Sequence, residues 1–138
     1  MGITVKVDIN AADIARKAVT PALRTYANMQ LYSHMYRYIP FRDGMLSANV
    51  TVTEECVHFI SPYAARMYTG DRYNFRKDHH PLACARWDRP AWAANGKQII
   101  TEIEAAYKYG DAFMMQAVTM ERGTIEQRKQ EAGANGQK

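Results

Sequence analysis

Four histidines and two cysteines are the residues that could support metal or nucleophilic chemistry in this chain. His79 and His80 are followed by Cys84, and imidazole and thiolate groups are typical zinc ligands. A structural zinc site needs four ligands at close spacings, and the other cysteine, Cys56, lies far away in the sequence. Because the two cysteines form no CxxC pair, we expect free thiols. The sequence therefore predicts no metal and no cofactor; a small metal-dependent enzyme built on His79, His80 and Cys84 is the alternative.

Motifs of nucleophilic or phosphate chemistry are absent from the sequence. It contains no GxSxG, no P-loop, no GxGxxG and no HExxH. Glu102 and Glu104 fall in an expected helix, where residues two apart point to different sides and cannot act as a pair. We therefore expect a protein that is not an enzyme.

Basic and aromatic residues gather in one part of the chain. The net charge of +4 is carried by residues 66–97, which hold seven basic and three acidic residues, and the remainder balances to zero. Arginine interleaved with aromatic rings suits a single-stranded nucleic-acid platform, but the same residue types are enriched at protein interfaces. We favour a protein interface, with a small nucleic-acid-binding module as the alternative. The candidate interface residues are Arg66, Tyr68, Arg72, Tyr73, Phe75, Arg76 and Lys77.

The first half of the chain predicts a strand, helices and a hairpin. Residues 3–9 alternate apolar and polar side chains, which indicates a strand with one buried face. Thr20 and Pro21 fit the N-cap and first position of a helix reaching about residue 38. That helix carries an apolar stripe: Leu23, Ala27, Leu31, Met35 and Tyr38. Residues 48–52 and 56–60 then predict two strands joined at Glu54 and Glu55.

The second half predicts a loop and a long helix. Residues 71–88 show no clear period, and a loop of this length in a compact domain is usually functional. A helix is expected from Arg89–Pro90 to Tyr109, anchored in the core by Trp87 and Trp92. A helix with Phe113, Ala117 and Met120 on its apolar side can follow. Gly44, Pro62, Tyr63 and Gly70 are expected to shape the turns.

These elements predict an α+β fold in which helices pack on a small antiparallel sheet, made by the N-terminal strand and the hairpin, with a long irregular basic loop. We expect residues 1–118 to form a single domain and residues 119–138 to form an extended or partly helical tail. No stretch approaches the roughly 18 uncharged apolar residues of a spanning helix, and no signal peptide is recognisable. We therefore expect no membrane partner and synthesis in the cytoplasm.

Three short motifs, in order, carry a resemblance to a known family. They read IPFRDGML at residues 39–46, SPYAARMYTG at residues 61–70 and ARWDRPAW at residues 85–92. In this order and spacing the sequence resembles the minor capsid or neck proteins of long-tailed phages, over about residues 3–109. Asp43 stands where the family tends to have threonine, and the basic loop holds less glycine than is typical.

The resemblance implies a structural subunit of the head-to-tail connector. Copies would associate into a ring that contacts neighbouring connector, portal or tail-tube proteins, with DNA passing through its lumen and no sequence-specific binding. The location implied is the virion, assembled in the cytoplasm of a bacterial host. A tail-completion or tail-terminator subunit of the same assembly is the alternative role.

Overall fold

The computed structural model describes residues 3–5, 20–40, 45–62, 64–70 and 80–136. Its elements are β1 (Ile3–Val5), α1 (Pro21–Met35), the 3₁₀ helix η1 (Tyr36–Tyr38), α2 (Met45–Ala48), β2 (Val50–Val52), β3 (Val57–Phe59), α3 (Ala64–Tyr68), α4 (Asp88–Tyr109) and α5 (Asp111–Gly136). The predicted α+β class is confirmed. None of the described helices is both long enough and apolar enough to cross a membrane.

The sheet is small and antiparallel, with strand order β1-β3-β2. The hairpin pairs Val50 with Phe59 and Val52 with Val57, and β1 pairs on the other side of β3. These four residues are buried and alternate with exposed ones, so one face of the hairpin contributes to the core. The predicted hairpin and its turn at residues 53–56 are therefore confirmed.

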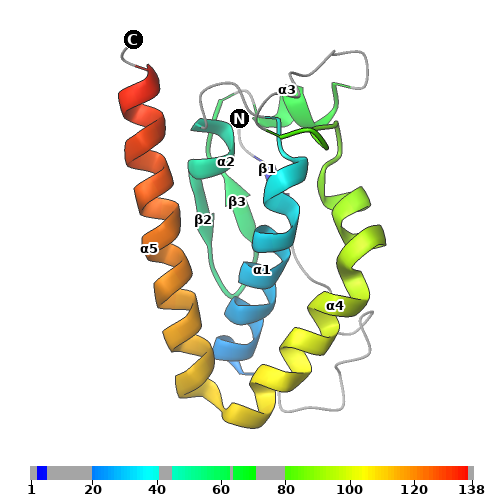
Figure 1. The fold of residues 1–138 in the computed structure, drawn as a ribbon, viewed down its shortest axis with the longest axis vertical. Coiled ribbons are helices and arrows are strands. Elements are labelled where there is room, and N and C mark those ends of the chain that lie inside the picture. The colour runs from blue at the N-terminus through cyan, green and yellow to red at the C-terminus, as the bar shows by residue number, and fades with distance from the viewer. Residues whose placement is uncertain (1–2, 6–19, 41–44, 63, 71–79, 137–138) are drawn as a thin grey trace.

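Helix α1 is the centre of the fold. Figure 1 shows α1 between α5 on one side and α4 on the other, and α1 contacts both helices and the hairpin strands. The Thr20 hydroxyl accepts a hydrogen bond from the Leu23 amide (3.1 Å), and Pro21 occupies the first turn, as the sequence predicted. The five residues of the predicted stripe are all buried.

Two elements differ from the sequence prediction. Ala48 was expected in a strand, but it ends the short helix α2, and β2 begins only at Val50. The last twenty residues were expected to form an extended or partly helical tail, and α5 runs through them to Gly136, burying Val118, Ile125 and Ala132 along its length. Phe113 and Met120, expected on its apolar side, are exposed. Whether residues 1–118 fold without this helix stays a prediction.

Candidate functional site

The chain leaves the sheet at a tight corner that leads into α3. The Ala64 amide donates to the Ser61 carbonyl (3.0 Å), and Pro62 between them is exposed. Helix α3 ends as the Gly70 amide donates to the Met67 carbonyl (3.3 Å). Arg66 on this short helix is exposed to solvent. The predicted turn residues Gly44 and Tyr63 lie outside the described residues.

Tyr68 joins α3 to the start of α4. Its hydroxyl donates to the Asp88 carboxylate, and its carbonyl accepts from the Arg86 amide (2.8 Å). Burial, and then the hydrogen bond to Asp88, raise the pKa of Tyr68 to about 12, although Arg89 nearby acts in the opposite direction. The phenol therefore stays protonated at neutral pH and works as a fixed donor between the two helices.

Trp87 lies beneath this corner and is fully buried. Its ring meets Phe59 edge-on at 5.5 Å and Tyr68 edge-on at 5.2 Å, between ring centroids. Within the described part of the chain, no group accepts a hydrogen bond from its indole Nε1–H. Trp92 is only partly buried and packs against the core. The Trp87 ring therefore supports α3 and the start of α4 from the core side.

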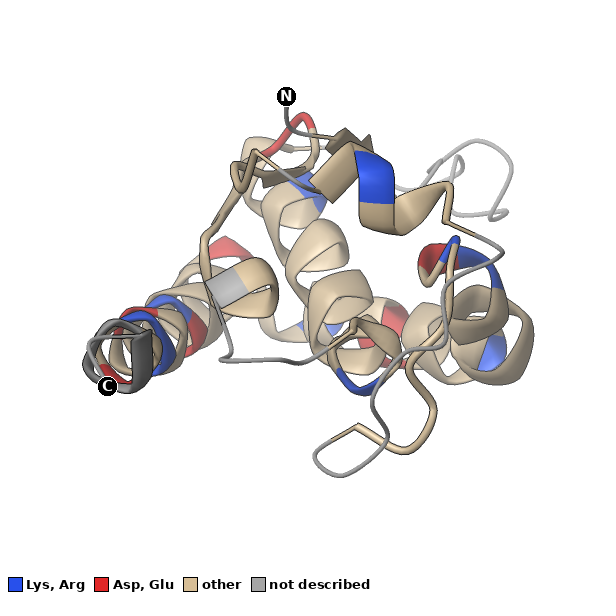
Figure 2. Ribbon diagram, turned by 90° about the horizontal axis from the view of Figure 1, so that it is seen from above, with Lys and Arg blue, Asp and Glu red and all other residues tan. Residues whose placement is uncertain are grey.

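Three arginines lie near Tyr68 along the backbone at this end of the molecule, one on α3 and two around the start of α4. Arg66 and Arg89 are exposed, and Arg86 is half-buried with a positive φ of 47°, which is uncommon for a residue with a side chain. Figure 2 looks down on this end and shows basic residues on α3 and at the start of α4. We call the group Arg66, Tyr68, Arg86 and Arg89 the basic corner. Arg66 and Tyr68 were predicted from the sequence as interface residues, whereas the position of Arg86 and Arg89 beside them was not predicted.

Residues 71–79 fall between the two halves of the basic corner. The predicted interface residues Arg72, Tyr73, Phe75, Arg76 and Lys77 belong to this segment, as does His79, and all lie outside the described residues. Their interface role stays a prediction. On either side of the segment, the Gly70 amide donates to the Met67 carbonyl at the end of α3, and His80 Nδ1 lies 2.7 Å from the Ile39 carbonyl oxygen.

His80 and Cys84, the described members of the possible zinc site, are engaged in other contacts. His80 is buried, with Nδ1 2.7 Å from the Ile39 carbonyl oxygen and its ring against Tyr36 at 4.6 Å. The Cys84 amide donates to the Tyr38 carbonyl (3.1 Å), and its sulfur is not part of a disulfide. Among the described residues, no three His, Cys, Asp or Glu side chains gather as metal ligands would.

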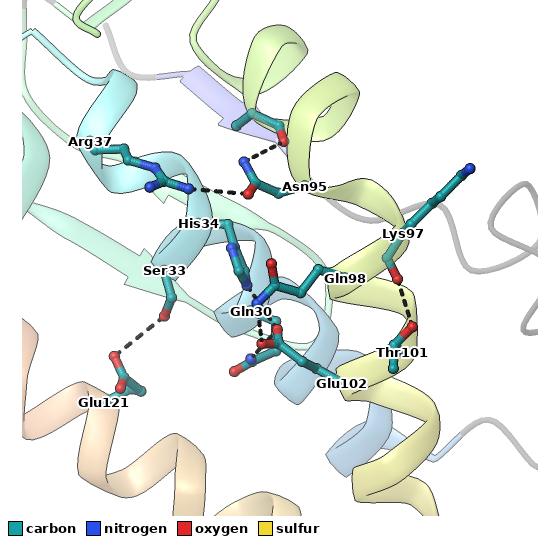
Figure 3. Close-up of polar contacts among 11 residues, drawn as sticks. Gln30, Ser33, His34, Arg37, Asn95, Lys97, Gln98, Thr101, Glu102 and Glu121 are labelled. Atoms are coloured by element: carbon teal, nitrogen blue, oxygen red, sulfur yellow. Dashed lines mark hydrogen bonds and ion pairs between the residues drawn. The ribbon is translucent and has the colours of Figure 1, made fainter. Parts of the chain in front are cut away.

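A polar cluster lies between α1 and α4. Glu102 Oε1 is 2.8 Å from His34 Nε2 and accepts a hydrogen bond from Gln30 at 2.9 Å. Further along the same interface, Arg37 donates to Asn95 Oδ1 at 3.1 Å, and Figure 3 shows these side chains meeting between the helices. These groups satisfy one another, so the arrangement fixes the position of α4 on α1.

A hollow of about 280 Å³ follows the outer edge of the sheet, between β2 and α5. The Arg122 guanidinium crosses it and donates to the Val52 carbonyl at 3.0 Å, and Ile125 and Lys129 form part of its wall. A helix and an arginine that cover an edge strand limit its pairing with other chains. We infer that α5 and Arg122, which border this hollow, protect the edge of β2 from pairing with another chain.

Comparison with known proteins gives one match. A family model described as minor capsid protein matches residues 3–109, which include every element from β1 to α4. No curated protein and no solved structure matches the chain. The match ends at the last residue of α4, and α5 lies wholly beyond it. Because the model covers most of the sequence, the chain belongs to the minor capsid protein family of phages.

Proposed function

We propose that this chain is a subunit of the phage head-to-tail connector, where it associates into a ring between the portal and the tail. The observation that carries the proposal is the family match over the α+β domain, since minor capsid proteins are structural components of phage particles. A ring requires two different patches on each subunit, which meet around the axis. The function proposed is structural, without catalysis.

The basic corner supports the proposal as one of these patches. Arg66 and Arg89 are exposed, while Tyr68, Asp88 and the buried Trp87 hold the backbone beneath them. Arginine and tyrosine are enriched among the residues that contribute most of the binding energy at protein interfaces. Residues 71–79, which carry the other predicted interface residues, lie in the sequence between Tyr68 and Arg86 of this corner.

The corner also fits a ring whose lumen passes DNA. Arginine side chains next to a channel would meet phosphates through charge alone, and the resulting affinity would fall with rising salt. We expect no base readout, and the role in DNA passage would be to line or border the channel. The location proposed for the protein is therefore the mature virion.

The test is the copy number and position of the protein in purified particles. Quantitative mass spectrometry should find it at the copy number of the portal, far below that of the major capsid protein, and particle cryo-microscopy should place it between portal and tail. Absence from particles would refute the proposal. Density at the head-proximal end of the tail tube, present also on tails that have not joined a head, would instead identify a tail-terminator subunit.

A charge-reversal experiment tests the basic corner itself. Particles should be produced with Arg66→Glu plus Arg89→Glu, and in parallel with Lys97→Glu, because Lys97 is exposed on the same helix α4 but points away from the polar cluster (Figure 3). We expect the double variant to accumulate heads without tails and the Lys97 variant to assemble normally. Equal assembly of both variants would exclude the corner from the connector interface.

A further inference from the structure

Helix α5 lies beyond the part of the chain that the family model matches, and a single residue connects it to α4. The match to the family ends at Tyr109 and α5 begins at Asp111, so only Gly110 lies between α4 and α5. Figure 1 shows the chain reversing direction at this elbow, so that α5 runs back along α1. The contacts of α5 with α1 and α2 therefore depend on the geometry of one glycine.

The face that α5 presents to the domain is a narrow seam. Its buried residues Met114, Val118, Ile125 and Ala132, with the half-buried Glu121 and Arg128, recur at alternating spacings of four and three. This is the two-in-seven pattern of a coiled-coil seam, narrower than the stripe of an ordinary packed helix. Most of the α5 surface is therefore already in solvent.

Two polar residues fix the register of this seam. The Ser33 hydroxyl donates to Glu121 Oε2 at 3.4 Å. The Arg128 guanidinium lies 3.8 Å from the centroid of the Tyr36 ring and donates to the Tyr32 hydroxyl at 3.4 Å. An α5 helix from any copy of the chain would find the same partners, and only in the same register.

The elbow is held in a conformation that only glycine adopts readily. Gly110 has φ 96° and ψ 174°, a region of backbone space that is nearly exclusive to glycine. Its amide donates to the carbonyls of Ala106 and Tyr107, and its carbonyl accepts from the Met114 amide. Rotation of this one residue to helical angles would join α4 and α5 into a single straight helix and would carry α5 away from its own domain.

Large apolar side chains are exposed on both sides of the elbow. Tyr109 is 73% exposed, Phe113 43% and Met120 70%. Their spacings of four and seven would put them on one side of a straight helix. In the bent form this stripe faces solvent, whereas two straight helices from two copies could cover it mutually.

We propose that α5 is exchanged between copies of this chain, so that the α1–α2 face of one subunit is covered by α5 of the next. The occupant is a second copy because the seam, its register and its two polar partners are reproduced only by this helix. Exchange keeps every seam contact and adds burial of the elbow stripe, and a short hinge favours such swapping. The inference concerns how two copies meet and does not depend on the position of the subunit in the particle.

The first test changes the hinge. Gly110→Ala disfavours the bent conformation, so light scattering of the purified chain should show the monomer–oligomer equilibrium shifted roughly tenfold or more toward oligomers. Gly123→Ala is the matched control, because it is the same substitution placed within α5, with open space around the added methyl group and no positive φ. Equal oligomer fractions for the two variants and the wild type would overturn the proposal.

The second test detects the exchanged helix in chains with the native hinge. Cys56 and Cys84 are replaced by alanine, and Ser33→Cys and Glu121→Cys are introduced on separate chains, which are mixed and treated with a short thiol cross-linker. Exchange predicts a covalent dimer that contains one chain of each kind. Carrying both substitutions on one chain reports the unexchanged form as an intramolecular link. If the double variant links only within itself and the mixture gives no dimer, α5 is not exchanged.

Discussion

The buried phenol of Tyr32 gives a prediction about stability in alkaline solution. Its hydroxyl donates to the Ser47 carbonyl at 2.7 Å, and desolvation by burial is the main cause that raises its pKa from 10 to about 12. Because the neutral form is favoured in the folded state, this contribution to stability is complete below about pH 10 and is lost as the pH rises toward about 12.

The magnitude follows from the size of the shift. About two pKa units at 1.36 kcal/mol each correspond to a loss of about 2.7 kcal/mol in the free energy of unfolding across this range. Tyr32→Phe removes the titrating group and so removes this loss, while it costs about 1 kcal/mol at neutral pH because the hydrogen bond to Ser47 is gone. The stability difference between wild type and variant should therefore shrink as the pH rises above about 10 and reverse near about pH 11, where the loss in the wild type exceeds about 1 kcal/mol.

The assay is urea unfolding followed by circular dichroism at a series of pH values from neutral to about 12. Tyr68, whose pKa is also raised to about 12, titrates in both proteins, so its contribution cancels in the difference. If Tyr32→Phe lost as much stability as the wild type between about pH 10 and 12, the assignment of a buried, neutral phenol would be refuted.

Five further substitutions, in three experiments, test local features of the packing. Gly123→Ala should raise the free energy of unfolding by about 1 kcal/mol, because alanine has a higher helix propensity than glycine and the added methyl group meets open space. Gly96→Ala should show no such gain, because its methyl group would come within 3.1 Å of the Trp92 ring. Chemical denaturation of the two variants compares them directly. Asn28→Ala should cost about 1–3 kcal/mol, because its buried amide donates to the carbonyls of two hairpin-turn residues, and hydrogen exchange at the hairpin should accelerate while α5 keeps its protection. Glu102→Ala and His34→Ala should be non-additive in a double-mutant cycle, by about 0.5–3 kcal/mol, and additive effects would mean that the 2.8 Å contact carries no coupling.

Local signals in the sequence predicted the domain well where they agreed with burial. Thr20 followed by Pro21 marks the start of α1 because capping chemistry and the missing proline amide both act within one turn. The stripe from Leu23 to Tyr38 is buried throughout, and valines alternating with polar residues gave the hairpin. These signals need no knowledge of distant contacts.

The buried side of helix α5 was predicted wrongly from the sequence, and the reason is physical. Two of its seam positions hold Glu121 and Arg128, so the apolar period is interrupted where α5 faces α1. The more visible apolar residues, Phe113 and Met120, are exposed instead. A polar residue becomes a seam residue only through its partner, here Tyr36 for Arg128, and that partner lies almost a hundred positions away.

The candidate site was predicted in part for a similar reason. Arg66 and Tyr68 were identified by composition, and both lie at the basic corner. Arg86 and Arg89 join them because Trp87 is buried and the chain turns sharply over it, at the positive φ of Arg86. Neither the turn nor the alignment of α3 with α4 has a sequence signature.

The unpaired indole of Trp87 makes the chain its own optical reporter. This ring is buried among Phe59, Tyr68 and the rest of the core, and no acceptor in the described structure bonds its N–H. An indole in such surroundings emits at short wavelength, and its emission shifts to the red as soon as a dipole or water reaches it. Because Trp87 lies directly under the basic corner, the fluorescence of a Trp92→Phe chain would record events at that corner in real time, without an attached dye.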